Sequence, residues 1–251
     1  MAAVSLAPEV IFHLEGIRIT NTILTTFLVD ILLISFVFLV SRNLKPVPGF
    51  LQNVAESAVD YFYSTTQQIA GKFTEPIYPW FGSFFLFIFT LNIVGLLPGV
   101  GSIGFFEVEH GENVFVPLFR AATSDFNTTL ALAVVSLCAT HYLAIKYNGV
   151  KGYLGKFFSL NPILLFVGML ELVSEITKVV SLSFRLFGNI YAGEVVLSTI
   201  SSLFAFVAPI PFLLLETIVA LVQALVFAML TMVFMSILIS PHAEEGSDRS
   251  R

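Results

Sequence analysis

Ionisable and amide side chains gather in the C-terminal third of this sequence, inside stretches that are otherwise apolar. The stretch SFRLFGNIYAGE at residues 183–194 holds an arginine, an asparagine and a glutamate, all within ten residues. A charge near the centre of a bilayer costs at least about 2.5–3.5 kcal/mol, so these groups point to an ion pathway or to a structural ion pair between helices. The candidate residues are Arg185, Glu194, Glu216, Gln223, Asn189, Glu171 and Glu175.

Helical spacing separates the candidate residues into groups that face different surroundings. At about 100° per residue, Arg185 shares one stripe with Lys178 and Glu171. Glu194 follows Arg185 by nine residues and therefore points to the opposite side of a straight helix. Arg185 and Glu194 are not expected to pair with each other. Glu175 and Asn189 border the Arg185 stripe, while Glu216 and Gln223, seven residues apart, share a face.

The composition predicts an all-α integral membrane protein with a single polytopic membrane domain over residues 1–251. Hydrophobic residues make up 57% of the chain and charged residues only 12%, about half the share in soluble domains. Long unbroken apolar runs favour helices over a β-barrel, whose strands alternate over about ten residues. The net charge of −5, without a basic stripe, argues against a nucleic-acid partner. The lone Cys138 and four scattered histidines predict no metal site, and we expect no cofactor.

Five membrane-crossing helices are expected, with a sixth helix lying at the membrane surface. Lysines and arginines concentrate in the loops after the first and third helices, whereas the loop over 99–127 is acidic, so the N-terminus is expected outside and the C-terminus inside. Residues 50–73 place apolar side chains on one helical face and polar, acidic ones on the other, which predicts an interfacial helix that meets a protein partner, with a cytoplasmic connector helix as the alternative. The crossing helices are expected at about 23–40, 81–97, 128–147, 162–206 and 212–239.

The fourth helix is too long for an upright crossing. A helix over about 161–206 would measure roughly 68 Å, against a hydrocarbon core of about 30 Å. A hairpin near 183–189 would leave backbone groups unsatisfied in the membrane, so a continuous helix tilted by about 60° is predicted. The same tilt brings Glu194 level with Glu216, because both then lie about 10 Å below the outer surface.

Several stretches resemble subunit a of the F-type ATP synthases. They are ELVSEITK, SLSFRLFGNIYAGE and LVQALVFAMLT, with LNIVGLLPG and SDFNTTLALA similar to the family's bacterial and chloroplast members. The resemblance implies a non-catalytic, proton-translocating stator subunit. Its implied partners are a rotating c-ring, peripheral-stalk subunits of the b type and membrane lipid. The implied location is a bacterial plasma membrane rather than a thylakoid membrane.

The resemblance also implies roles by position. Arg185 matches the essential arginine that faces the carboxylates of the c-ring, and Glu194 and Glu216 match the polar pair of the outer half-channel. Family members often pair a carboxylate with a histidine there, whereas this sequence has two glutamates. Gln223 matches a glutamine beside the arginine, Asn189 belongs to the arginine motif, Glu171 matches an inner carboxylate, and the role of Glu175 is open.

The implied mechanism has two offset half-channels. A proton enters from outside through Glu194 and Glu216, rides on a ring carboxylate, and leaves to the inside past Glu175 and Glu171. Arg185 separates the two paths, because an arginine stays charged and cannot pass a proton on. The main alternative function is a self-contained secondary transporter or channel, although the sequence shows no repeated half and no paired broken helices.

Four further polar residues are weaker candidates for the pathway. Asn92, Asp125 and Asn127 lie near the outer ends of the second and third helices, where ordinary helix capping explains Asp125 equally well. His141 lies near the inner end of the third helix and is interpreted as a hydrogen-bonded residue between helices, with a proton relay as the alternative.

Overall fold

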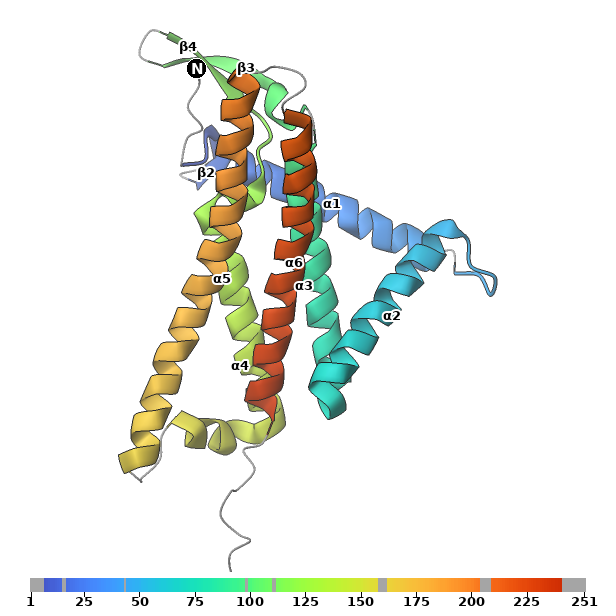
Figure 1. Cartoon of the computed structure of the whole chain (residues 1–251), viewed down its shortest axis with the longest axis vertical. Helices are drawn as coiled ribbons and strands as arrows, with labels where there is room; N and C mark the ends of the chain where they lie inside the picture. The colour runs from blue at the N-terminus through green and yellow to red at the C-terminus, as the bar shows by residue number, and fades with distance from the viewer. Residues whose placement is uncertain are drawn as a thin grey trace, which may run out of the picture.

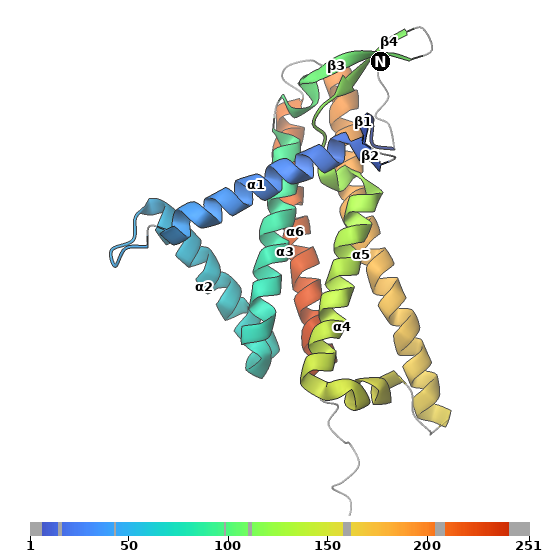
Figure 2. The same ribbon diagram turned by 180° about the vertical axis from the view of Figure 1, so that it is seen from behind.

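A computed structural model describes residues 7–14, 17–42, 44–97, 99–109, 112–157, 162–203 and 209–240 of the chain. Four long helices run beside one another along the longest dimension of the molecule (Figures 1 and 2). α3 packs along α6, and α4 packs along both α5 and α6. The predicted helical class is confirmed. The four helices are α3 (Thr74–Leu96), α4 (Phe126–Phe157), α5 (Pro162–Leu203) and α6 (Pro209–Ile239).

The core of the bundle lies where α3 and α6 face each other. Phe81 of α3 and Phe227 of α6 are almost completely buried there. Small side chains on α6 recur every fourth residue and let the neighbouring backbone approach closely, as is common between membrane helices. These fully buried residues are Ala220, Ala224 and Ala228.

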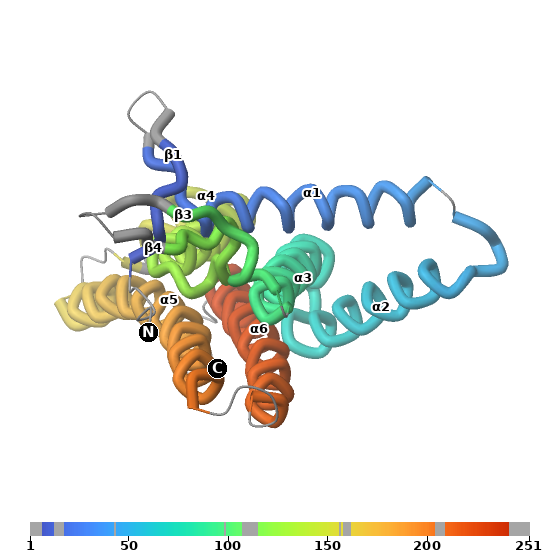
Figure 3. Tube along the Cα trace, turned by 90° about the horizontal axis from the view of Figure 1, so that it is seen from above, coloured from blue at the N-terminus to red at the C-terminus, as the bar shows by residue number. Residues whose placement is uncertain are grey.

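Two N-terminal helices lie outside this bundle. α1 (Asn21–Arg42) crosses it at a steep angle, and α2 (Phe50–Ala70) returns from the far end of α1 to α3 (Figures 1 to 3). The return is fixed by Phe62, whose ring packs 5.3 Å from those of Phe81 and Phe85. A short 3-10 turn over Gly71–Phe73 joins α2 to α3. The helix expected over 50–73 therefore exists, and its polar face is exposed.

Two β-hairpins were not predicted from the sequence. β1 (Val10–Leu14) pairs antiparallel with β2 (Ile17–Thr20), and β3 (Gly104–Glu109) with β4 (Glu112–Pro117). They lie toward one end of the bundle (Figure 1). Short 3-10 turns at Val100–Ser102 and Ala122–Ser124, the latter called η3, flank the second hairpin. Each sheet has only two strands, so the hairpins are small additions to a helical membrane protein, and the fold class remains all-α.

The helix boundaries differ from those expected at the prolines. α3 begins at Thr74 rather than near 81, since Pro76 falls in the first turn, where a backbone N–H has no intrahelical partner. Pro79 is accommodated one turn later, inside the helix. α6 likewise begins at Pro209 rather than 212, because proline is well suited to the first helical position.

The chain bends within α4 but not within α5. α4 extends past 147 and kinks at Gly149, whose φ of 70° lies in the region that glycine adopts most easily. α5 is one continuous helix of 42 residues from Pro162 to Leu203, with no turn near 183–189. Residues 204–206 of the predicted fourth helix lie outside the described residues.

Four helical segments of the described chain are long and apolar enough to cross a membrane. They are Asn21–Arg42, Phe50–Leu96, Phe126–Gly155 and Pro209–Ile239. α5 is not among them, because it carries three glutamates, a lysine and an arginine. The fold is therefore that of a multi-pass membrane protein whose longest helix is also its most charged membrane segment.

Candidate functional site

Arg185 lies at the middle of α5 with its side chain exposed. Its guanidinium donates a hydrogen bond to Ser181 Oγ, one turn earlier, at 3.4 Å. Within the described part of the chain it contacts no carboxylate. A guanidinium carries five N–H donors, so this arginine has the capacity to bind a further partner outside the chain.

Asn189 and Gln223 join the Arg185 face to α6. Asn189 lies one turn after Arg185, and its Nδ2 donates to Gln223 Oε1 at 2.8 Å. Gln223 is only 5% exposed, and its Nε2 has no hydrogen-bond partner among the described residues. Gln223, which the resemblance places beside the arginine, thus bonds to Asn189 one turn from Arg185 and makes no hydrogen bond with Arg185 itself among the described residues.

Glu216 projects from α6 onto the backbone of α5. It is 7% exposed, and its carboxylate lies so close to Gly193 that a Cβ added there would overlap it. Its Oε1 has no hydrogen-bond partner in the described residues. Glu194 is the next residue along α5, so its backbone lies close to the Glu216 carboxylate, while the pairing of the two side chains in one proton path stays a prediction.

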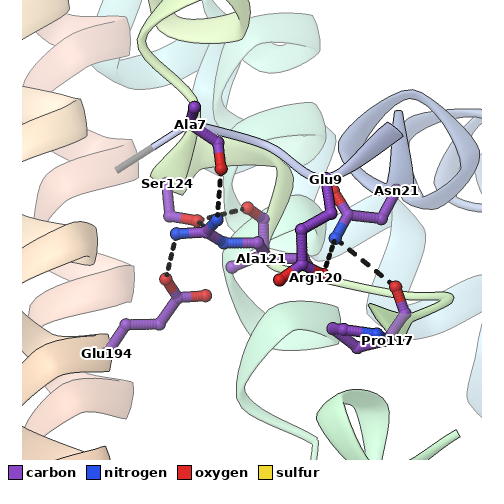
Figure 4. Close-up of polar contacts among 8 residues, drawn as sticks. All are labelled: Ala7, Glu9, Asn21, Pro117, Arg120, Ala121, Ser124 and Glu194. Atoms are coloured by element: carbon purple, nitrogen blue, oxygen red, sulfur yellow. Dashed lines mark hydrogen bonds and ion pairs between the residues drawn. The ribbon is translucent and has the colours of Figure 1, made fainter. Parts of the chain in front are cut away.

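Glu194 has an ion-pair partner that sequence reasoning missed. Its Oε2 accepts a hydrogen bond from an Nη of Arg120 at 3.2 Å (Figure 4). Arg120 precedes η3 and is 9% exposed, while Glu194 is 26% exposed. As predicted, Glu194 does not pair with Arg185. The only sequence signal for Arg120 was its position as a single cation in an acidic loop next to a run of small residues.

The segment around η3 is buried among three helices, and hydrogen bonds of polar side chains hold it there. Thr123 Oγ1 donates to Asn92 Oδ1 of α3 at 2.7 Å, and Asn92 Nδ2 donates to the Ala220 carbonyl of α6 at 3.3 Å. Both ends of the Asn92 amide are therefore occupied by protein groups. Asn92 holds this loop against the bundle.

Asp125 caps α4 and also contacts α1. Its Oδ1 accepts from the backbone N–H of Asn127 at 2.9 Å, in the geometry of a helix N-cap, and from Asn127 Nδ2 at 3.2 Å. Its Oδ2 accepts from Thr22 Oγ1 at 3.1 Å. Asp125 thus caps α4, and its part in the ion pathway stays a prediction.

A second polar cluster lies toward the other end of the bundle, between α4 and α5. Glu175 is 5% exposed, and its Oε1 accepts from Lys178 Nζ at 2.7 Å. His141 Nε2 lies 3.9 Å from Glu175 Oε2, and the Tyr153 hydroxyl lies 3.0 Å from His141 Nδ1. Glu171 is half-buried and makes no hydrogen bond or ion pair with other described residues.

Two groups of ionisable residues thus lie along α5, on either side of Arg185. Glu194 and Glu216 form one group, and Glu175 with His141 forms the other. Over the described residues, no cluster of histidine, cysteine and carboxylate side chains has the arrangement of a metal site.

Sequence comparison decides the family. Residues 23–236 match the family model described as ATP synthase A chain. The chain belongs to the ATP synthase A chain family. It is 32% identical over 235 residues to ATP synthase subunit a of Moorella thermoacetica, covering 94% of this chain and 98% of that protein. The named role of the family places the chain among the membrane subunits of the ATP synthase complex.

Two further bacterial relatives agree. The chain is 33% identical over 212 residues to ATP synthase subunit a 3 of Pelobacter propionicus, covering 83% of each protein. It is 31% identical over 234 residues to ATP synthase subunit a 2 of a Bradyrhizobium strain, covering 93% of this chain and 95% of that protein. Each match extends over most of both chains, so the family applies to the whole membrane domain and not to one motif.

Proposed function

We propose that the chain is the ion-translocating stator subunit of a rotary ATP synthase, with Arg185 as the barrier between two offset half-channels. The observation that carries this proposal is the exposed guanidinium of Arg185 at the middle of a 42-residue membrane helix. A charge there is costly unless it meets an opposite charge. A carboxylate on the rotating c-ring supplies that charge each time one passes, and the permanently charged arginine prevents direct proton flow between the half-channels.

The outer half-channel is assigned to the region around Glu194 and Glu216. An open groove of about 680 Å³ leads toward it and is lined by Asp125, Asn127 and Asp30, among others. Ala7 also lines this groove, and its carbonyl accepts a hydrogen bond from Arg120, the ion-pair partner of Glu194. Ala7 thus connects the wall of the groove to Arg120 and, through it, to Glu194.

The inner half-channel is assigned to Glu175 and Glu171, with His141 beside them. Glu175 Oε2 is buried and accepts no hydrogen bond from other described residues, so one oxygen remains available to a proton or a water molecule. His141 Nε2 lies 3.9 Å from that oxygen, and His141 Nδ1 lies 3.0 Å from the Tyr153 hydroxyl. This arrangement supports a role for Glu175, which family resemblance left open.

The steep tilt of α5 is supported by the direction of α1. α1 has a mean hydropathy of 2.7, and 11% of its most apolar window is buried, as suits a helix surrounded by lipid. If α1 crosses the bilayer with an ordinary tilt of about 20°, then the helices that it crosses steeply must lie far from the membrane normal. α5, about 63 Å long at 42 residues, fits a core of about 30 Å in that orientation.

The remaining assignments follow from loop charge and from the relatives. We assign the chain to a bacterial plasma membrane, with the N-terminus and the two hairpins outside and the C-terminus in the cytoplasm. The three relatives described above are bacterial proteins. The exposed face of α5 meets the c-ring, α2 meets a peripheral-stalk subunit of the b type, and lipid covers the rest.

Cysteine cross-linking tests the contact with the ring. Ala192 is exposed and lies seven residues after Arg185 on the same stripe, whereas Leu186 is fully buried. In a background with Cys138→Ser, Ala192→Cys is expected to form a disulfide with a cysteine placed beside the ring carboxylate, and Leu186→Cys is not. Purification of the chain without any c subunit, together with no cross-link from Ala192→Cys, would reject the stator function in favour of a self-contained transporter.

A further inference from the structure

Arg120 is held in place from three directions. Its Nε donates to Ser124 Oγ at 3.1 Å, and one Nη donates to the Ala7 carbonyl at 3.3 Å. The other Nη binds Glu194 Oε2 at 3.2 Å (Figure 4). The backbone N–H of Arg120 also donates to Thr25 Oγ1 of α1 at 3.2 Å. The guanidinium is thus a fixed charge that cannot turn toward another carboxylate without losing several bonds.

The two glutamates of the outer region differ in their surroundings. Glu194 has the Arg120 guanidinium at hydrogen-bond distance. Glu216, across Gly193, is more deeply buried and forms no ion pair with any cation of the described segments. A buried carboxylate without a cation is far costlier in its charged form than one bound to an arginine. Glu216 is therefore the carboxylate whose charged form its surroundings stabilise less.

We propose that Arg120 makes the two carboxylates unequal, holding Glu194 as a fixed anion and leaving Glu216 as the group that gains and loses the transported proton. This inference rests on the proposed function, because it divides labour within the outer half-channel. Arg120 is a positioning residue: it acts through Glu194 and does not itself carry the proton. It differs in this from Arg185, which the proposed function places against the ring.

The proposal has a specific consequence for single and double variants. Glu194→Gln leaves the fixed Arg120 charge buried without its counter-charge, which favours the charged form of the nearby Glu216 and so hinders its uptake of a proton. Arg120→Gln leaves Glu194 as a second carboxylate without a cation, which competes with Glu216 for the proton. Arg120→Gln combined with Glu194→Gln removes both charges, and the double variant is expected to conduct better than either single variant.

The test is passive proton uptake, driven by a membrane potential, through complexes from which the catalytic sector has been stripped. Arg120→Gln and Glu194→Gln are each expected to lower the rate by at least about tenfold, and the double variant to recover to within about threefold of the unmodified complex. Arg120→Lys keeps a charge and is expected to lose less than Arg120→Gln. Glu216→Gln is expected to stay inactive in every background. Arg42→Gln, at an exposed arginine at the C-terminal end of α1, is the matched control.

The possible outcomes separate this inference from the proposed function. If Glu194→Gln and Glu216→Gln slow uptake but Arg120→Gln behaves like Arg42→Gln, only the role of Arg120 is rejected. If the losses of the two single variants simply multiply in the double variant, the role of Arg120 is also rejected. If neither Arg120→Gln nor the double variant accumulates in the membrane, Arg120 serves only the fold. If Glu194→Gln and Glu216→Gln both conduct normally, the outer half-channel itself is wrongly assigned.

Discussion

The regions around Arg120 and Arg185 contain the same side chain in opposite circumstances. Arg120 is 9% exposed and donates to a hydroxyl, a carbonyl and a carboxylate. Arg185 is exposed and donates to the hydroxyl of Ser181 alone among the described residues. The chain thus provides hydrogen-bond partners for the Arg120 guanidinium and leaves most of the Arg185 guanidinium exposed on its surface. This difference separates a residue that organises its own subunit from one that acts on a partner.

Two polar residues near Arg120 are bonded within the chain at both ends, whereas Gln223 near Arg185 is not; Glu216 Oε1 and Asn21 Oδ1 also lack a partner among the described residues. Around Arg120, Asn92 and Asp125 have both of their polar ends occupied by the chain. Around Arg185, the Gln223 Nε2 lacks a hydrogen-bond partner in the described residues. Polar groups in a membrane segment that the chain leaves unsatisfied need a partner or water. The following predictions test this division, in order of decreasing effect.

Arg185→Ala is expected to abolish ATP-driven proton pumping while leaving the amount of assembled complex nearly unchanged. The exposed side chain contributes little to packing within the chain, so its loss removes function without unfolding the subunit. Arg185→Lys should also fail or leak, since a desolvated lysine releases its proton far more readily than an arginine. Acidification of inverted vesicles measures both variants. Normal pumping by the alanine variant would remove the distinction between the two arginines.

Glu216→Gln is expected to slow proton flux by about 100-fold or more, the usual range for loss of a proton-transferring group. Glu216→His is expected to retain more flux, because the imidazole also exchanges protons near neutral pH. Glu75→Gln, at an exposed glutamate in the first turn of α3, is the control. Equal rates for Glu216→Gln and Glu75→Gln would show that the outer path runs elsewhere.

Gly193→Ala is expected to reduce proton flux by roughly tenfold, because the added methyl group overlaps the Glu216 carboxylate. The surroundings of the carboxylate must then shift, although no ionisable group has been removed. Gly155→Ala introduces the same methyl group in α4 at a place with no atom within 4 Å, and is expected to leave flux unchanged. A similar small effect at both glycines would mean that Glu216 moves aside freely.

Tyr153→Phe is expected to have the smallest effect of the set. It removes the hydrogen bond between the Tyr153 hydroxyl and His141 Nδ1, 3.0 Å long, while keeping the ring that packs on Phe157. The expected cost is about 1 kcal/mol of stability. Thermal release of the subunit from the complex measures it. A loss of pumping comparable to that of Glu216→Gln would instead give the His141 region an essential part in proton exit.

Features carried by local sequence were predictable, and those created by long-range packing were not. The continuous α5 follows from its length and its lack of a breaker, and the pairing of Glu194 with Glu216 was implied by family resemblance. The start of α3 was placed too late in the sequence, because a proline disrupts the interior of a helix but is tolerated in its first turn. The β3–β4 hairpin lay in a loop without a distinct strand pattern.

Arg120 is the clearest example of what the sequence could not provide. Its burial depends on contacts with Ala7, Thr25 and Glu194, which lie far from it along the chain. No spacing rule links residues from four separate segments. The sequence alone presented Arg120 as an ordinary loop cation.

The charges of α5 also bear on how the subunit enters the membrane. α5 is not apolar enough to be recognised as a crossing by itself, whereas α6, which follows it, is among the most apolar segments. During synthesis α5 therefore emerges before α6, the helix whose Gln223 and Glu216 lie against it. We expect α5 to remain at the insertion machinery until α6 arrives, so that the two enter the bilayer as a pair. Without the partner proposed above, Arg185 would stay exposed to lipid, at a cost of at least about 2.5 kcal/mol.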